Sequence, residues 1–382
     1  MHVLHVSNSL VAGGSELHLL ALCRHLGALG VTQTVAYLHE RPVSRTLKDN
    51  FEAIGVPAIP AHAEGRYNVT FPLAVSSIVA RIGPDILHTH LPRADLAGAF
   101  VTLRARSLPW VISMHNIYGA HSWSGAALLP VLDVVWRRAD LIIAVSGAVA
   151  EWLIGRGIDP GRVRMIHYGI DDEAFAPPPG DPKARWGWSG RPVVTAIGRL
   201  TPHKGFATLI SAWQVVHAQM PDAVLAIAGW DVQGYRQVLE AQIDALGLQD
   251  AVRLMGFLDD VPAFLAAGDV FAHPTTSEGF GQVMIEAMAA ARPIVCSRIP
   301  PLMEIVVDGE TGVFVPPGDA EALGAALLRI LTDPEAPAMG ARGRARVRAH
   351  YSAARMAERT LDVYSEVLGL RSPAPVRAAG GS

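Results

Sequence analysis

Short apolar runs alternate with stretches of helical periodicity along almost the whole chain, and this alternation restricts the fold more than any other feature. Continuous apolar strands that alternate with helices are typical of a parallel sheet covered by helices on both faces. The predicted strands are residues 3–6, 34–38, 56–59, 85–90, 109–115, 139–146, 163–171, 193–198, 223–229, 252–257, 269–274, 293–297 and 312–315. The predicted fold class is therefore α/β, with doubly wound, Rossmann-like parallel sheets.

A proline-rich break at residues 176–182 divides this alternation into two series, and a chain of 382 residues is too long for one ordinary core. The resulting prediction is an N-terminal Rossmann-like domain, a linker, a C-terminal Rossmann-like domain, a C-terminal helix that packs back toward the N-terminal domain, and a disordered tail. Their predicted bounds are 1–175, 176–190, 191–350, 351–370 and 371–382. Each domain is expected to turn the carboxyl ends of its strands toward a shared cleft, where ligands of such sheets bind.

The composition excludes several classes of protein. Half of the residues are hydrophobic and the formal net charge is −3, so no general basic field predicts a nucleic-acid partner. The two cysteines, Cys23 and Cys296, lie far apart and outside any zinc pattern, and we predict neither a disulfide nor a metal site. The N-terminus enters a strand without a basic leader, and no apolar run is long enough for a membrane span. We expect a cytoplasmic protein with at most a peripheral membrane contact.

Two glutamates stand eight positions apart, Glu278 in a glycine-rich turn after a predicted strand and Glu286 in the helix that follows. A helix N-terminus offers free N–H groups and the positive end of a dipole, and glycines let a ligand approach the backbone. Such a turn can bind a phosphate, and carboxylates beside it can accept hydrogen bonds from sugar or ribose hydroxyls. A plain surface loop followed by a charged helix is the alternative interpretation.

Two cations, Arg199 and Lys204, follow the first strand of the second series and suit a diphosphate. Solvated surface cations are the alternative, and the Gly-x-x-x-x-Gly-Lys-Ser/Thr pattern of a nucleoside-triphosphatase loop is absent here. At the end of the first strand of the first series, Gly13 and Gly14 offer backbone amides to an anion. A tight turn with Ser15 as helix N-cap competes with that interpretation.

Histidines lie at the ends of two predicted strands. His115 could turn its imidazole or its backbone carbonyl toward a ligand, although an isolated histidine is more often structural. The pair His88 and His90 suggests a metal, but no further ligands accompany it in the sequence, and a structural role is favoured. Asp260, with Asp259, is predicted to cap a helix, and the arginine-rich stretch 342–348 reads as a solvated helical face rather than a membrane contact.

Together these motifs resemble the retaining GT-B glycosyltransferases of family 4, also called glycosyl transferases group 1, over residues 1–370. The Glu278-x7-Glu286 spacing within Glu-Gly-Phe-Gly is the most specific mark, and Gly198-Arg199-Leu200 with Lys204-Gly205 is the second. The chain departs from a common family form at Tyr168, where Asn is usual, and His203 occupies a variable position.

The resemblance implies a nucleotide-sugar donor, UDP- or GDP-linked, bound by the second domain, and acceptor contacts in the first. Arg199 and Lys204 would hold the diphosphate, Glu286 the ribose hydroxyls and Glu278 the donor sugar, with His115 beside the reacting sugar. The implied catalytic residues are His115, Glu278, Arg199 and Lys204; the implied donor-binding residues are Gly13, Gly14, Arg199, Lys204, Gly256, Phe257, Glu278, Phe280, Gly281, Gln282, Val283 and Glu286.

The implied reaction is sugar transfer to a saccharide or lipid-linked hydroxyl acceptor with retention at the anomeric carbon, without metal or cofactor, in polysaccharide, lipopolysaccharide or glycolipid synthesis. The leaving phosphate could take the acceptor proton, so no carboxylate nucleophile is required. The acceptor contacts are expected around residues 66–71, 92–96 and 118–124. A sugar-nucleotide epimerase of the same fold and a non-catalytic sugar-nucleotide-binding subunit stay open as alternatives.

Overall fold

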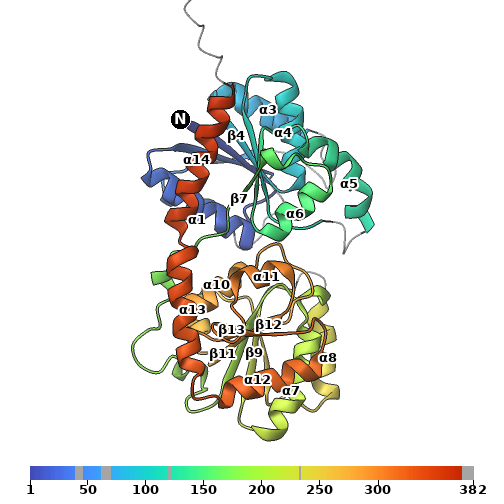
Figure 1. Ribbon diagram of the computed structural model, residues 1–382, viewed down its shortest axis with the longest axis vertical. Coiled ribbons are helices and arrows are strands. Elements are labelled where there is room, and N and C mark those ends of the chain that lie inside the picture. The colour runs from blue at the N-terminus through green and yellow to red at the C-terminus, as the bar shows by residue number, and fades with distance from the viewer. Residues whose placement is uncertain (39–45, 62–69, 119–122, 232–233, 372–382) are drawn as a thin grey trace, which may run out of the picture. The chain divides into compact units, whose positions relative to one another are not determined.

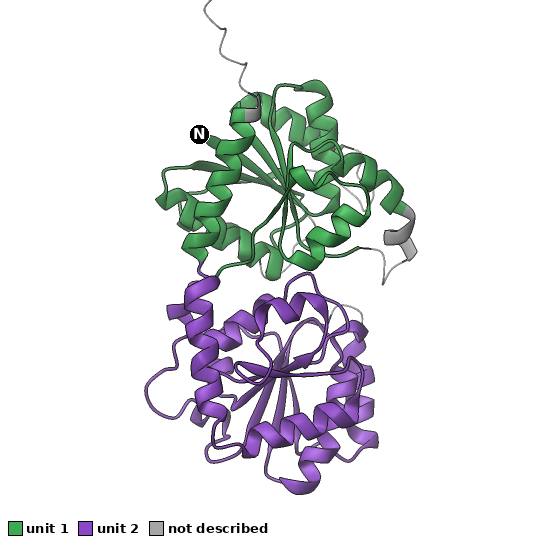
Figure 2. Ribbon diagram, in the orientation of Figure 1, with its two compact units in different colours: residues 1–169, 353–382 green, residues 170–352 purple. Residues whose placement is uncertain are grey.

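A computed structural model describes residues 1–38, 46–61, 70–118, 123–231 and 234–371. The chain forms two compact units (Figure 2). Unit 1 contains residues 1–169 together with the chain from Ala353 onward, and unit 2 contains Ile170–Ser352. The predicted tail at 372–382 and parts of two predicted acceptor segments, 66–69 and 119–122, lie outside the described residues.

Unit 1 is built around a parallel sheet with the strand order β3-β2-β1-β4-β5-β6-β7 among its described residues. Its strands are β1 (His2–Ser7), β2 (Thr32–Leu38), β3 (Ala58–Ala61), β4 (Ile86–His90), β5 (Trp110–Met114), β6 (Leu141–Ala144) and β7 (Val163–Met165). Its helices are α1 (Gly14–Ala28), α2 (Lys48–Ala53), α3 (Phe71–Ile82), α4 (Pro92–Arg104), α5 (Trp123–Trp136), α6 (Gly147–Gly155) and α14 (Ala353–Arg371). The order reverses between β1 and β4, so the loops that follow these two strands meet at a topological switch point.

The last helix, α14, completes the core of unit 1 by packing beside α1 (Figure 1). Tyr364 and Val367 of α14 are fully buried in a cluster with Leu22 and Leu26 of α1. An apolar stripe at helical spacing explains this placement, because a helix must bury that stripe against another element.

Unit 2 has a parallel sheet with the order β10-β9-β8-β11-β12-β13. Its strands are β8 (Val193–Ile197), β9 (Val224–Ala228), β10 (Val252–Gly256), β11 (Val270–His273), β12 (Ile294–Ser297) and β13 (Gly312–Val315). Its helices are α7 (Phe206–Gln219), α8 (Tyr235–Ala245), α9 (Val261–Ala266), α10 (Gln282–Ala289), α11 (Pro300–Ile305), α12 (Ala320–Thr332) and α13 (Ala336–His350). The switch point of this sheet lies between β8 and β11, which pair in parallel.

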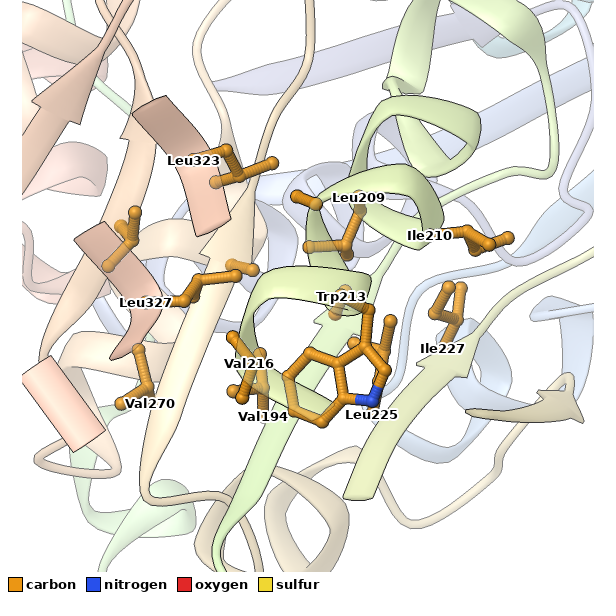
Figure 3. Packing of buried hydrophobic residues seen from close by; sticks show 14 of the residues in the cluster. Val194, Leu209, Ile210, Trp213, Val216, Leu225, Ile227, Val270, Leu323 and Leu327 are labelled. Carbon is orange, nitrogen blue, oxygen red and sulfur yellow. The ribbon is translucent and has the colours of Figure 1, made fainter. Parts of the chain in front are cut away.

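The core of unit 2 lies between the sheet and the pair α7 and α12. Figure 3 shows Trp213 of α7 among Val194, Leu225 and other aliphatic side chains of this cluster. Trp213 is fully buried, and full burial of a large apolar side chain stabilises a fold by about 2–3 kcal/mol. This packing fixes the position of the sheet and therefore of the loops at its carboxyl edge.

The stretch predicted as a linker, 176–190, belongs to unit 2 in this structure. It contains a short 3-10 helix, Ala184–Trp186, and Trp188 packs into a buried cluster with Val193 and Phe264. Lys183 forms an ion pair with Asp269 at 2.7 Å. The proline-rich segment is therefore attached to unit 2 by side-chain contacts that its composition does not indicate.

Among the described residues, no helix is both long and apolar enough to cross a membrane. The arginine-rich stretch lies on α13, where Arg346 donates to the carbonyls of Ile305 and Glu304 and Arg348 pairs with Asp172. Arg342 donates to the carbonyl of Glu310. These arginines serve contacts within unit 2.

Candidate functional site

The loops that follow β8 and β11 adjoin one another at the switch point of unit 2. The carbonyl of His203 accepts hydrogen bonds from the Thr276 N–H at 2.8 Å and from the Thr275 hydroxyl at 3.0 Å. Gly205 has φ +73°, and a Cβ at this position would lie 2.0 Å from the Pro274 carbonyl oxygen. Only glycine allows the two loops to approach this closely.

This close approach brings Lys204 of the first loop to Glu278 of the second, and the two form an ion pair. Each side chain is 13% exposed. The His273 ring, at the end of β11, lies 3.0 Å from the same carboxylate oxygen of Glu278 through Nε2. Burial alone would raise the pKa of the Glu278 carboxyl, but Lys204 and His273 hold that pKa well below its usual range. Glu278 is therefore an ionised carboxylate, largely buried and paired with Lys204.

Helix α10 starts at the same edge, directly after the glycine-rich turn. Its N-cap is Gly281, with φ +101° and no side-chain cap hydrogen bond, so the first N–H groups of the helix have no side-chain acceptor at the cap. Gln282 and Val283 follow Gly281 at this end, where an anion is stabilised by the helix dipole. Phe280 is 2% exposed and packs against Tyr351 with ring centroids 5.9 Å apart.

Glu286 lies on α10 one turn further and is 8% exposed. Burial raises the pKa of its carboxyl to about 7, although the Gln282 amide donates to it at 2.9 Å. The two glutamates therefore have opposite electrostatic environments: Glu278 pairs with the Lys204 cation and contacts the His273 ring, whereas burial dominates the environment of Glu286.

The remaining predicted donor-binding residues of unit 2, Arg199, Gly256 and Phe257, lie at the ends of β8 and β10. Arg199 is exposed in the loop after β8. Gly229 donates its N–H to the Gly256 carbonyl at 2.7 Å, and a Cβ on Gly229 would lie 1.7 Å from the Gly198 carbonyl oxygen. Phe257 packs edge-on against Trp230 with ring centroids 5.1 Å apart, which places an aromatic pair at this edge of the sheet.

In unit 1, Gly13 is the N-cap of α1 and Gly14 is its first residue. Ser15 does not cap the helix, because its hydroxyl donates to the Glu16 carboxylate at 2.8 Å. A Cβ on Gly13 would lie 2.8 Å from the same carboxylate. The helix start is therefore capped by Gly13 and not by Ser15, and binding of an anion by the Gly13 and Gly14 amides stays a prediction.

His115 directly follows β5 and is 4% exposed. Its Nε2 lies 3.2 Å from His90 Nδ1, and its Nδ1 lies 2.5 Å from the hydroxyl of Tyr168. Burial lowers the pKa of His115 to about 3, so the ring is neutral. Both ring nitrogens therefore have partners within unit 1.

Sequence reasoning missed several buried polar residues. In unit 1, His5 and His18 are almost fully buried, and so is Tyr364, whose hydroxyl lies 2.7 Å from His88 Nδ1; in unit 2, His273 is almost fully buried beside Glu278. His5 lies beside His88 because β1 pairs in parallel with β4, a register that only the structure shows. Asp260 accepts from the Ala263 N–H at 3.1 Å and caps α9, which confirms the capping prediction.

The comparisons with known proteins agree with this fold. Residues 12–174 match the family model Glycosyltransferase Family 4, and residues 183–346 match the model Glycosyl transferases group 1. The crystal structure of Anabaena Alr3699/HepE in complex with UDP-glucose superimposes with a TM-score of 0.86 at 25% identity, covering 96% of this chain and 100% of that one.

Two curated relatives are similar in sequence. Alpha-maltose-1-phosphate synthase of Mycolicibacterium smegmatis is 30% identical over 309 residues, 74% of this chain and 79% of the relative. Sulfoquinovosyl transferase SQD2 of Arabidopsis thaliana is 30% identical over 275 residues, which are 68% of this chain and about half, 52%, of the relative.

The two Rossmann-like parallel-sheet units and these matches show that the chain has the GT-B fold of glycosyltransferases. The chain belongs to the glycosyltransferase family described by these two models, family 4 with its group 1 domain.

Proposed function

We propose that the protein transfers a sugar from a nucleotide-sugar donor to a hydroxyl acceptor with retention of anomeric configuration, in the synthesis of a polysaccharide, lipopolysaccharide or glycolipid. One observation carries the proposal: Lys204, Glu278 and the uncapped start of α10 all lie where β8 and β11 end, at the switch point of unit 2. A cation and N–H groups that can bind a diphosphate, with a carboxylate that can accept hydrogen bonds from sugar hydroxyls, at one edge of the sheet suit a sugar diphosphate.

In this proposal unit 2 binds the donor. Lys204 and Arg199 bind the diphosphate and stabilise the negative charge that develops on the leaving nucleotide. Glu278 accepts hydrogen bonds from the sugar, Glu286 from the ribose, and the aromatic pair Trp230 and Phe257 borders the nucleobase.

The relatives support a nucleotide-linked donor. The Anabaena protein was crystallised with UDP-glucose, with UDP, and with UDP and glucose. We propose UDP-glucose as the first donor to test, with GDP-mannose second, since a GDP-mannose-dependent mannosyltransferase of Mycolicibacterium smegmatis is 34% identical over 238 residues.

The test has two stages. Differential scanning fluorimetry with UDP-, GDP- and ADP-sugars identifies the donor, because a ligand of the folded state raises Tm. NMR of the transfer product then reads the anomeric configuration. Transfer with the α configuration from an α-linked donor supports the proposal, and an inverted product contradicts retention. An epimerised donor without any transferred sugar contradicts the proposal as a whole.

A further inference from the structure

A line of hydrogen bonds runs across unit 1 from β2 to Tyr168 in the loop after β7. Gln33 Oε1 lies 3.3 Å from His5 Nε2, and His5 Nδ1 lies 3.1 Å from His90 Nε2. His90 Nδ1 lies 3.2 Å from His115 Nε2, and His115 Nδ1 lies 2.5 Å from the hydroxyl of Tyr168. We call these five residues the histidine chain. Each is at most 5% exposed.

The direction of every bond in the histidine chain follows from its first residue. The amide nitrogen of Gln33 donates to the Cys23 carbonyl at 2.8 Å, so the amide oxygen faces His5 and can only accept. His5 must then carry its proton on Nε2, which leaves His5 Nδ1 as an acceptor.

The remaining bonds of the histidine chain follow in the same way. His90 donates from Nε2 to His5, and its Nδ1 accepts from His115 Nε2–H. His115 Nδ1 then accepts, and the Tyr168 hydroxyl donates to it. The opposite direction ends with an unprotonated His5 Nε2 against the oxygen of Gln33, where two acceptors repel. The geometry therefore allows one set of tautomers, with all three rings neutral and protonated on Nε2.

Tyr168, the last residue of the histidine chain, also contacts helix α1. Its ring stacks on the ring of His18 in α1, with centroids 4.0 Å apart and an interplanar angle of 23°. Because α1 begins at Gly13 and Gly14, Tyr168 joins the end of β5 at His115 to the helix that follows the first glycine turn. A tyrosine can supply both contacts, whereas an asparagine at this position has no ring to stack.

We propose that Tyr168 is a positioning residue: its hydroxyl closes the histidine chain and holds His115 in one tautomer and one ring orientation. The His115 imidazole, with both nitrogens engaged, is then neither acid nor base toward a substrate, and it offers a ligand only a rigid backbone. The importance of this rigidity for transfer rests on the proposed function; the tautomers do not.

A metal site is the competing explanation for these residues. Ring nitrogens of His5, His88 and His90 lie within 4.8 Å of one another and are buried. A metal there must break the bond between His5 and His90, and it must also displace the Tyr364 hydroxyl or the Ser113 hydroxyl, at 2.7 and 2.8 Å, from His88. None of the three rings has a nitrogen without a hydrogen-bond partner, so a metal could bind only at the expense of these bonds. We therefore favour the histidine chain.

The first test is NMR of the full-length protein labelled with 15N in the histidine rings. Long-range proton–nitrogen spectra at pH 7.5 should show neutral rings protonated on Nε2 for His5, His90 and His115. Tyr168→Phe keeps the ring that stacks on His18 but removes the donor, so the His115 Nδ1 signal should shift toward that of a nitrogen without a hydrogen bond.

Tyr364→Phe is the matched control. It also removes a buried hydroxyl from a histidine Nδ1, but that histidine is His88, outside the histidine chain. His115 signals should not change in this variant. A His115 ring protonated on Nδ1, or stoichiometric zinc in the purified protein with metal-shifted His5 and His90 signals, would overturn the proposal.

The second test is kinetic. Once a donor is known, Tyr168→Phe should lower kcat roughly three- to tenfold, the range that corresponds to the loss of one hydrogen bond, with KM for the donor unchanged. An unchanged kcat together with a shifted His115 signal overturns the positioning role. If wild-type protein transfers no sugar while the NMR result holds, the proposed function fails and the histidine chain stands.

Discussion

Lys204 and Glu278, 74 positions apart in the sequence, form an ion pair at the carboxyl edge of the second sheet. The pair means that the cation proposed for the diphosphate is already neutralised by the carboxylate proposed for the sugar. Donor binding must therefore exchange one contact for another, and the two residues should respond differently to UDP and to UDP-glucose.

Glu278→Gln should separate these two ligands. It removes the anion that competes for Lys204, so UDP should bind at least as tightly as to the wild type. UDP-glucose should lose the sugar contact and bind about tenfold more weakly, as expected for a hydrogen bond to a charged group. Isothermal titration calorimetry with both ligands measures the difference. Equal weakening of UDP and UDP-glucose would contradict a sugar role for Glu278.

Lys204→Met should weaken UDP and UDP-glucose alike, by about 10- to 100-fold, because the diphosphate loses a charge-assisted contact. It also leaves the carboxylate of Glu278 without its main cation. In urea unfolding, the double variant Lys204→Met/Glu278→Gln should therefore be more stable than the sum of the two single effects predicts, with a coupling energy of about 1–3 kcal/mol. Additive effects would show that the pair contributes nothing to the fold.

The affinity for UDP-glucose should depend on pH through Glu286. Its pKa is raised to about 7 by burial, and a carboxylate that accepts two ribose hydroxyls must be ionised. Affinity should therefore be highest above pH 7 and fall as the pH decreases below it, by about tenfold between pH 8 and pH 6 if only the ionised form binds.

Glu286→Gln is the control for this titration, since its amide cannot ionise. Its affinity should be lower than that of the wild type at pH 8 and nearly independent of pH. A pH profile that is the same in both proteins would assign the titration to another group.

Gly205 and Gly229, which lie against backbone oxygens of neighbouring loops in unit 2, should be intolerant of substitution. Gly205→Ala and Gly229→Ala each force a Cβ against a backbone oxygen, at 2.0 and 1.7 Å, and should destabilise the protein by more than about 2 kcal/mol and abolish donor binding. Gly247→Ala is the matched control for Gly205→Ala, because its φ of +67° is close to the +73° of Gly205 but nothing lies within 4 Å of its Cβ position. It should cost only about 1 kcal/mol in strain. Urea unfolding measures all three variants.

Unit 1 should lose stability as the pH falls below 6.5. Burial lowers the pKa of His5 to about 4 and that of His115 to about 3, and it lowers the pKa of His88, His90 and His18 well below the usual value. Between these values and pH 6.5 the unfolded chain binds more protons than the folded one, so the free energy of unfolding decreases with decreasing pH.

Asp95 has the opposite effect on stability: burial raises its pKa to about 7, so its contribution to the free energy of unfolding increases as the pH falls. The five buried histidines outnumber this single carboxyl. Hydrogen exchange at pH 7 and pH 5, corrected for intrinsic rates, should show loss of protection in peptides of the unit 1 strands before those of unit 2. Equal loss in both units would exclude the buried histidines as the acid-sensitive element.

Local pattern was sufficient to predict the strands and helices that carry the site. The apolar run at 193–198 became β8 (Val193–Ile197), and the run at 269–274 became β11 (Val270–His273). The arginine-rich stretch 342–348 lies on α13 of unit 2, whereas the predicted C-terminal helix 351–370 corresponds to α14 (Ala353–Arg371) of unit 1. Apolar periodicity identifies a buried face, but it does not say which sheet the face will cover.

The motif around Glu278 and Glu286, with Arg199 and Lys204, also followed from sequence through the family resemblance, and the family is confirmed. The side-chain contacts of these four residues could not be predicted from the sequence. The sequence alone determined two parallel-sheet domains and the residues that gather at their carboxyl edges, because strand and helix periodicity and glycine turns are local properties. Only the tertiary structure decided that Lys204 meets Glu278 and that Tyr168 meets His115, because the strand order and the loop packing bring together groups that are distant along the chain.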